Sequence, residues 1–250
     1  MRHNTVRGGS IEAVRIHDNA RNVKLVGNNI DGGRNNHTVK VKSESSGANP
    51  DGIVIRGNRF SKTYYSGSSE DLLQLEGHNY VEITNNTFAD NPRGEDGVDV
   101  KQGTRGMLME RNRFEGGNIN AECLLVQGSE ADNVVQDNVF DDCKGVSLGA
   151  HPEAQQSPWW RFEGNQLRDS MLRIRRSVNA EIVGVDMVGG TLKLGLTSRD
   201  DTPRNLKIRN SRFADVEIDN NLEYGYECAD NVMLNTSLDG LQCSETSTAE

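Results

Sequence analysis

Three side chains within residues 94–114 (GEDGVDVKQGTRGMLMERNRF) could carry acid–base chemistry. Asp96, Asp99 and Lys101 fall within a span of six residues. Asp99 and Lys101 are two positions apart, so in a β-strand they lie on the same face. A carboxyl group and an amine can move protons to and from a substrate, and carboxylate oxygens can also bind a hard cation. These residues are the first candidates for a functional site.

An internal repeat must position these residues. An Asn two places before a large apolar anchor recurs six times, with anchors 26 to 30 residues apart, and degenerate copies end at Met187, Phe213 and Leu238. A second apolar residue lies five places before each anchor, with Met233 in the last copy. A short repeat cannot bury its own apolar face, so its copies stack into a solenoid. The six full copies are Asn28/Ile30, Asn58/Phe60, Asn86/Phe88, Asn112/Phe114, Asn138/Phe140 and Asn165/Leu167.

The repeat predicts an all-β fold, a single-stranded right-handed parallel β-helix (solenoid) of about nine coils. Each repeated Asn is expected to take the left-handed conformation at a tight corner and to hydrogen-bond to the Asn of the next coil. Apolar pairs such as Val98/Val100 are expected to point inward, and Val216/Ile218 is the pair predicted for the last coil. We predict one β-helix domain over residues 1–243 and a disordered tail over residues 244–250.

Composition excludes several classes of protein. The chain has 250 residues, of which 34% are hydrophobic and 26 are glycine, a balance that favours short strands and turns. Its net charge of −9 provides no net basic surface to displace counterions, so nucleic acid is not expected as a partner. No run approaches the roughly 18 apolar residues of a membrane span. The chain lacks an apolar signal region and enters the repeat almost at once, so we expect a truncated or processed start. The oligomeric state stays open.

The four cysteines do not show the spacing of a metal site. Cys123 and Cys143 fall in successive copies of the repeat, so a bridge between them and buried free thiols are both open alternatives. Cys228 and Cys243 lie in the degenerate C-terminal part of the chain.

Stacking would bring charged side chains of neighbouring coils together, because parallel strands lie about 4.8 Å apart. Glu76 would then lie beside Lys101, with Lys42 one coil earlier. Opposite charges in such columns are also typical of ordinary salt-bridge ladders on a solvated surface. The site hypothesis and the salt-bridge hypothesis both remain open from this pattern.

A column of acidic residues is predicted at the turn before these strands. Asp71, Asp96 and Glu122 occupy equivalent positions in consecutive coils. Carboxylates this close raise one another's pKa or recruit a cation, and Ca²⁺ accepts sites rich in oxygen. We therefore predict a Ca²⁺ site, with the ligands Asp71, Glu76, Asp96 and Asp99.

The motifs GN-x-[F/I/L] and D-G-[V/I]-x-[V/I] resemble those of the pectate-lyase-like right-handed β-helix superfamily, from about Arg15 to Leu241. The resemblance implies a lyase that cleaves an acidic, uronate-containing polysaccharide by β-elimination, with Ca²⁺ or an arginine neutralising the uronate. Such a protein is expected outside the cell or in the periplasm. Lys101 is the predicted base, because neighbouring cations lower the pKa of a lysine. The other predicted catalytic residues are Asp99, Asp96 and Glu122, and the predicted substrate-binding residues are Lys42, Arg173, Arg175 and Trp159.

Two alternatives to a lyase are retained. The segments at residues 94–97, 121–123, 143–145 and 173–175 resemble, in order, the N-T-D-G, D-D-C, G-H-G and R-I-K motifs of polygalacturonases, which are glycoside hydrolases. That resemblance implies Asp96 and Glu122 as the acting carboxyl groups. The third hypothesis is a non-catalytic β-helix that binds glycans, similar to an adhesin or a tailspike.

Overall fold

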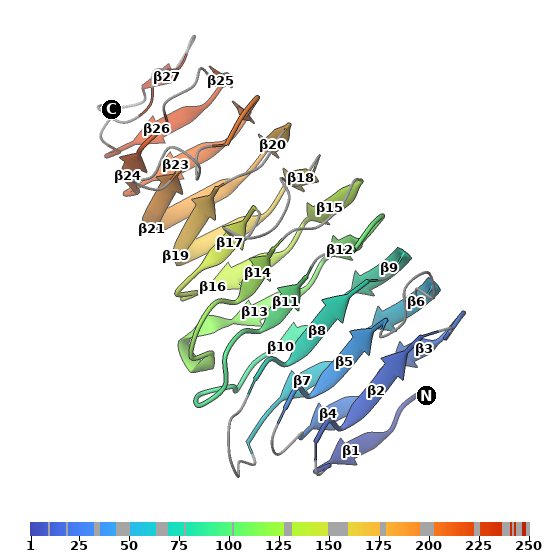
Figure 1. Cartoon of the computed structure of the whole chain (residues 1–250). Coiled ribbons are helices and arrows are strands. Elements are labelled where there is room, and N and C mark those ends of the chain that lie inside the picture. The colour runs from blue at the N-terminus through green and yellow to red at the C-terminus, as the bar shows by residue number, and fades with distance from the viewer. Residues whose placement is uncertain are drawn as a thin grey trace.

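The computed structural model describes residues 1–9, 11–18, 20–32, 36–43, 51–63, 70–77, 79–101, 103–127, 132–149, 160–175, 179–195, 203–222, 226–236, 241, 243 and 247–248. Short strands wind from one end of the molecule to the other, with the two termini at opposite ends (Figure 1). The helical element in the described ranges is η1 (Gly116–Asn118).

The strands stack in three parallel ladders, each named here after its first strand. The β2 ladder contains β2 (Val14–His17), β5 (Val39–Lys42), β8 (Leu73–Glu76), β11 (Val98–Val100), β14 (Leu124–Val126), β17 (Val146–Leu148), the end of β19 (Gln166–Ile174), the end of β21 (Asp186–Leu194) and β24 (Glu217–Asn220). The β3 ladder contains β3 (Lys24–Val26), β6 (Asp51–Arg56), β9 (Asn79–Thr84), β12 (Leu108–Glu110), β15 (Asn133–Gln136), β18 (Trp160–Glu163), β20 (Ala180–Val183), β22 (Lys207–Arg209) and β25 (Glu227–Ala229).

The β1 ladder contains β1 (Thr5–Arg7), β4 (Asn29–Asp31), β7 (Arg59–Ser61), β10 (Thr87–Phe88), β13 (Arg113–Glu115), β16 (Val139–Asp141), the starts of β19 and β21, β23 (Arg212–Ala214), β26 (Val232–Leu234) and β27 (Ser247–Thr248). Nine strands stack in the β3 ladder. The predicted parallel β-helix is therefore confirmed.

A ladder of buried asparagines joins successive coils at the corner between the β3 and β1 ladders. Asn58, Asn86, Asn112 and Asn138 are at most 2% exposed. Each donates from Nδ2 to Oδ1 of the next ladder Asn at 2.9 or 3.0 Å. That oxygen also accepts the backbone N–H of the donating Asn at 2.9 Å. The predicted Asn ladder is confirmed.

The left-handed corner residue is the one before each ladder Asn. Gly27, Gly57, Asn85, Arg111 and Asp137 have φ between 53° and 65°, whereas the ladder asparagines do not have positive φ. The prediction that the ladder Asn itself adopts this conformation is therefore wrong. The Asn is required for its hydrogen bonds, and the turn is made one residue earlier.

Stacked phenylalanines fill the core behind the ladder. Phe60, Phe88, Phe114 and Phe140 are 0% exposed, with successive ring centroids 4.7 to 4.9 Å apart and nearly parallel planes. The inward pair Val98/Val100 is likewise 0% exposed. These rings repeat because the coil spacing of parallel strands matches the separation preferred by offset-stacked aromatic rings.

The last coil differs from its predicted register. Ile218 pairs with Leu192, and the position after Leu192, Lys193, pairs with Asp219. The predicted inward pair Val216/Ile218 is thus displaced by two residues. Met233 pairs with Phe213 and is therefore the last anchor of the β1 ladder among these two strands. The repeat predicted Leu238 as this anchor, and Leu238 lies outside the described ranges.

Two disulfides are present. Cys123–Cys143 links adjacent coils with a Cα–Cα distance of 5.7 Å, and Cys228 is bonded to Cys243. Of the two alternatives for Cys123 and Cys143, the structure has the bridge.

The described part of the C-terminal segment contains β27, which pairs with β26. Most of residues 244–250 lies outside the described ranges, so the predicted tail and domain boundary stay predictions. In the ranges that the structure describes, no helix has the length and apolar character needed to cross a membrane.

The Asn ladder predicts a large effect of Asn112→Ala. This change removes Asn112 Oδ1, which accepts both the backbone N–H and Nδ2 of Asn86. It also removes Asn112 Nδ2, which donates to Ile83 O. We expect the free energy of unfolding to fall by about 3 kcal/mol, because buried polar groups lose their partners. Chemical denaturation measures it, and Asn29→Ala, at an exposed β4 position, is the control with little expected effect. Equal effects of the two changes would refute the role of the ladder.

Candidate functional site

Most of the candidate residues lie on the outward side of the β2 ladder or at the turn that enters it. Val98 pairs with Leu73 on one side and Leu124 on the other, which aligns three consecutive coils. Because Val98 and Val100 point inward, Asp99 lies on the outward side of β11, as predicted.

Asp71, Asp96 and Asp99 form a compact carboxylate cluster, with one ligand oxygen from each lying within 4.8 Å of the others. The three residues are 1%, 6% and 3% exposed. The backbone N–H of Asp96 donates to Asp71 Oδ1 at 3.1 Å, and that of Glu122 donates to Asp96 Oδ1 at 2.8 Å. Backbone groups of the next coil therefore fix two of the three carboxyl groups.

The cluster separates the pKa values of its members. Burial, reinforced by the charge of Asp71, raises the pKa of Asp96 to about 8. Burial also raises the pKa of Asp71 and of Asp99 to about 6 each, although Lys101 lowers both. At pH 7 the Asp96 carboxyl group is therefore mainly protonated, whereas those of Asp71 and Asp99 are mainly ionised.

Lys101 is an ion-pair partner of this cluster. Its Nζ lies 3.2 Å from Asp99 Oδ2, and Gln127 Nε2 donates to Asp99 Oδ1 at 3.1 Å. Burial lowers the pKa of Lys101, but the charges of Asp99, Asp71 and Glu76 outweigh it and the net pKa is raised. The neighbours of Lys101 are anions, so its surroundings oppose the predicted role as a base and favour a role as a fixed positive charge.

His37 extends the cluster by one coil, and sequence analysis assigned it no function. It is 1% exposed, with Nδ1 3.1 Å from Asp71 Oδ2 and Nε2 2.7 Å from Glu70 Oε2. Burial lowers its pKa to about 3, so the ring is neutral at pH 7. The backbone N–H of Asp71 also lies 3.3 Å from Nδ1, so both a donor and a carboxylate oxygen of Asp71 contact this ring nitrogen. Its equivalence to Asp71 in the coil alignment was the available signal.

Lys62 is a second residue that sequence analysis missed. It is 0% exposed, and its Nζ donates to the backbone carbonyl oxygen of Asn36. Burial lowers its pKa to about 8, although Asp71 and Glu70 act in the opposite direction. Lys62 belongs to none of the repeated columns, so the repeat did not indicate its burial.

The remaining candidates form separate ion pairs. Lys42 Nζ lies 3.2 Å from Glu76 Oε2, and Glu76 does not belong to the three-carboxylate cluster found among the described residues. Arg173 Nη1 lies 2.8 Å from Glu122 Oε1 and 3.3 Å from Ser147 Oγ. The Lys42–Glu76 and Arg173–Ser147 contacts link neighbouring coils, and the Arg173–Glu122 pair spans the coil between β14 and β19, in the manner of a salt-bridge ladder.

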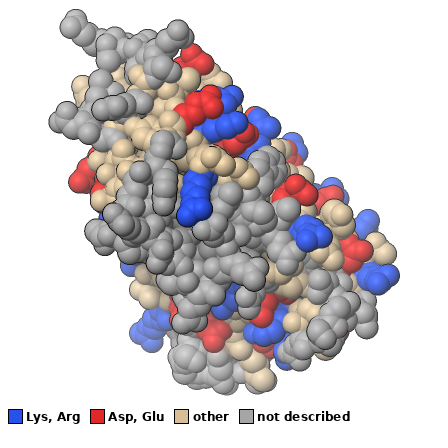
Figure 2. Space-filling view, turned by 45° about the horizontal axis from the view of Figure 1, so that its top comes forward, with Lys and Arg blue, Asp and Glu red and all other residues tan. Residues whose placement is uncertain are grey.

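Two predicted substrate-binding residues add little to this geometry. Arg175 follows β19 on the same ladder and is half-buried, with its backbone N–H bonded to Leu148 O. Trp159 lies outside the described residues. On the face shown in Figure 2, basic and acidic side chains alternate among the described atoms, without one extended patch of a single sign.

The chain belongs to the right-handed β-helix region family, whose model matches residues 12–199. This match confirms the predicted fold class and its hand, and it is not specific to the pectate-lyase-like superfamily. A similar solved structure is the Streptococcus pneumoniae surface protein and adhesin PfbA, with 11% sequence identity and a TM-score of 0.47. The alignment covers 98% of this chain but 66% of the PfbA chain. No curated protein matches the sequence.

Because the pKa of Asp96 is raised, we predict that the free energy of unfolding decreases as pH increases. The folded state holds a proton that the unfolded state has lost, so this stabilisation is lost as pH rises through about 8. We expect the free energy of unfolding to fall by about 1.5 kcal/mol between pH 6.5 and 8. The window starts at the ordinary pKa of histidine and ends at the pKa of Lys62, because titration of His37 and Lys62 changes the stability less within these limits.

Asp96→Asn keeps the oxygen that accepts the Glu122 N–H and removes the titration. We expect the variant to lose much less stability over the same pH window. Denaturation series with a chelator present measure both proteins. Parallel pH profiles would contradict the assignment to Asp96.

Proposed function

We propose that this protein acts on an acidic, uronate-containing polysaccharide at the outward side of the β2 ladder. The observation that carries the proposal is the Asp71–Asp96–Asp99 cluster, in which burial gives neighbouring carboxyl groups different protonation states. Separated pKa values of this kind suit one group as acid and the other as base. The disulfides Cys123–Cys143 and Cys228–Cys243 support an extracellular or periplasmic location, because such bonds persist in oxidising compartments.

β-Elimination is the reaction that we propose for the site. It requires a base that takes the proton beside the uronate carboxyl group and an acid that protonates the departing glycosidic oxygen. Asp99, mainly ionised at pH 7, would accept the first proton, and Asp96, mainly protonated, would donate the second. Lys101, 39% exposed beside Asp99, would contribute positive charge toward the uronate carboxylate.

The cluster also fits a Ca²⁺ ion. Asp71, Asp96 and Asp99 offer hard oxygen donors within 4.8 Å of one another, and their raised pKa values are consistent with a shortage of compensating positive charge. A bound Ca²⁺ would supply neutralisation of the uronate carboxylate. Because the ion binds ionised carboxylates, it would displace the proton of Asp96, and the two forms of the cluster exclude each other.

Glycan binding without cleavage is the second candidate function. It is favoured by the ion pair of Lys101 with Asp99 and by the low exposure of all three aspartates, since a catalytic group must reach the reacting atoms. In this alternative the outward side of the ladder holds the polysaccharide, and the buried acids stabilise the solenoid.

A depolymerisation screen distinguishes these functions. The purified chain is incubated with pectate, alginate and glycosaminoglycans, with Ca²⁺ or chelator, while ultraviolet absorbance of unsaturated uronates and new reducing ends are recorded. We expect the absorbance to rise, and Asp99→Asn to lower its rate at least about a hundredfold, as for loss of an acid–base group. Asp141→Asn, at an exposed position on the β1 ladder, is the control with an unchanged rate.

Reducing ends without absorbance would indicate hydrolysis and refute β-elimination. The cluster oxygens lie closer than the spacing of about 6.5 Å or more used by inverting hydrolases, so hydrolysis would be expected to retain configuration. Binding without either product would favour the second candidate, and neither binding nor cleavage of any acidic polysaccharide would refute the proposed function.

Calcium binding is tested independently of activity. We expect millimolar Ca²⁺ to raise the Tm of the wild-type chain by a few degrees, and more at pH 8 than at pH 6, because the ion competes with the cluster protons. Asp71→Asn and Asp99→Asn should abolish the shift, whereas Asp141→Asn should retain it. The same shift in all four proteins would place the ion elsewhere.

A further inference from the structure

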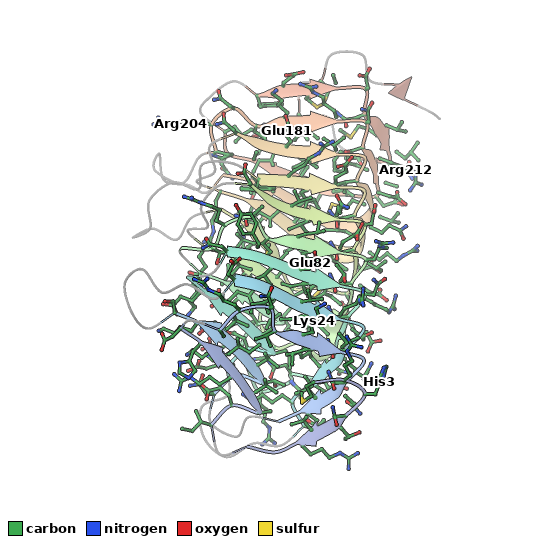
Figure 3. All side chains as sticks on the ribbon, turned by 90° about the vertical axis from the view of Figure 1, so that its right-hand side faces the viewer. His3, Lys24, Glu82, Glu181, Arg204 and Arg212 are labelled. Atoms are coloured by element: carbon green, nitrogen blue, oxygen red, sulfur yellow. A yellow bond between two sulfur atoms is a disulfide. The ribbon has the colours of Figure 1, made fainter. Side chains whose placement is uncertain are left out.

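The corner between the β2 and β3 ladders carries an exposed aromatic ring. Tyr80, the second residue of β9, is 65% exposed. The other large apolar residues exposed in the described ranges are Met1 and Ile11, both near the N-terminus, so Tyr80 is the aromatic member of this group. Glu82, the next outward residue on β9, lies on the β3 ladder face turned toward the viewer in Figure 3.

The backbone of Tyr80 is in a conformation unfavourable for its residue type. Its φ is 53°, in the left-handed region that bulky residues avoid. The equivalent corner positions of other described coils also have positive φ, and their residues are Asn22, Gly52, Gly106, Asp132, Asn179 and Asn205. At these described positions other than Tyr80 the corner thus uses Asn, Gly or Asp, the types that tolerate this conformation. An exposed tyrosine there gains little burial to offset its strain.

A glycine on the following coil leaves room for the ring. Tyr80 lies between Gly52 and Gly106 in the corner column. A Cβ added at Gly106 would lie 2.9 Å from Tyr80 Cδ1, so the ring leans across the backbone of Gly106. At Gly52 the nearest atoms belong to Asn22 instead. The ring is therefore supported on the Gly106 side while most of its surface faces solvent.

We propose that Tyr80 is a stacking site for a sugar ring of the bound polysaccharide. A flat, supported and open aromatic ring is suited to the apolar C–H face of a pyranose. Strain that is retained at an exposed position is also typical of a functional residue. Tyr80 follows Glu76, at the end of β8, by four residues in the same coil, so a polymer on the β2 ladder would reach it by continuing over the corner. The inference rests on the proposed function and adds a subsite to it.

Tyr80→Asn tests the proposal through two effects of opposite sign. The variant has a residue type that suits the corner, so its Tm should be unchanged or higher. Its affinity for the polysaccharide should fall at least about fivefold, as for loss of an aromatic contact. Tyr80→Phe should keep the wild-type affinity, and Asp132→Asn, in the same column, should change neither quantity. Affinity electrophoresis with pectate, alginate and neutral dextran, together with thermal denaturation, gives both measurements.

A lower Tm with unchanged affinity would make Tyr80 a packing residue and overturn the proposal. If the wild type bound dextran but no acidic polysaccharide, the proposed function would fail, whereas weaker dextran binding by Tyr80→Asn would still support the stacking site. Equal affinity of wild type and Tyr80→Asn for an acidic polysaccharide would overturn the stacking site and leave the proposed function intact. Absence of binding to every polysaccharide would overturn both.

Discussion

The buried asparagine ladder is the interaction on which the solenoid depends. At each corner the chain leaves one β-ladder for the next, and its backbone N–H and carbonyl groups would lose their sheet partners. Asn112 shows how the side chain replaces them: its Oδ1 accepts from Asn86, and its Nδ2 donates to Ile83 O and Asn138. An amide combines donor and acceptor, so one residue type can satisfy both kinds of group in every coil.

The candidate site is a carboxylate version of the same device. Asp71 and Asp96 each accept a backbone N–H from the next coil, whereas each ladder asparagine accepts one from the preceding coil. A carboxylate has no donor of its own, however, and burial disfavours its charge. Burial therefore raises the pKa of both carboxyl groups, although the backbone hydrogen bonds that they accept act in the opposite direction. Neutral His37 and buried Lys62 complete a network whose charges are set by burial.

The sequence was sufficient for the parts of the structure that repeat. The Asn-x-Phe spacing predicted the ladder and the inward column, because coils stacked in register must repeat the same side chain at the same place. It also placed Asp71, Asp96 and Asp99 in one predicted site, together with Glu76, which lies outside the observed cluster. It left open whether Lys101 would act at a site or form an ion pair, and the structure has the pair with Asp99. It did not predict the burial of Lys62, which belongs to none of the repeated columns. In the last coil, Met233 follows Phe213 by only 20 residues, and the shorter coil misplaced the register.

The bond between Cys123 and Cys143 has a mechanical consequence. Each coil contacts mainly its two neighbours, so a pull on the C-terminus would peel coils away one after another from that end. When peeling reached Cys143, tension would pass through the disulfide directly to Cys123. The residues between them would stay out of the force path and would not lengthen. A chain anchored at one end and loaded at the other would therefore extend less than its residue number implies.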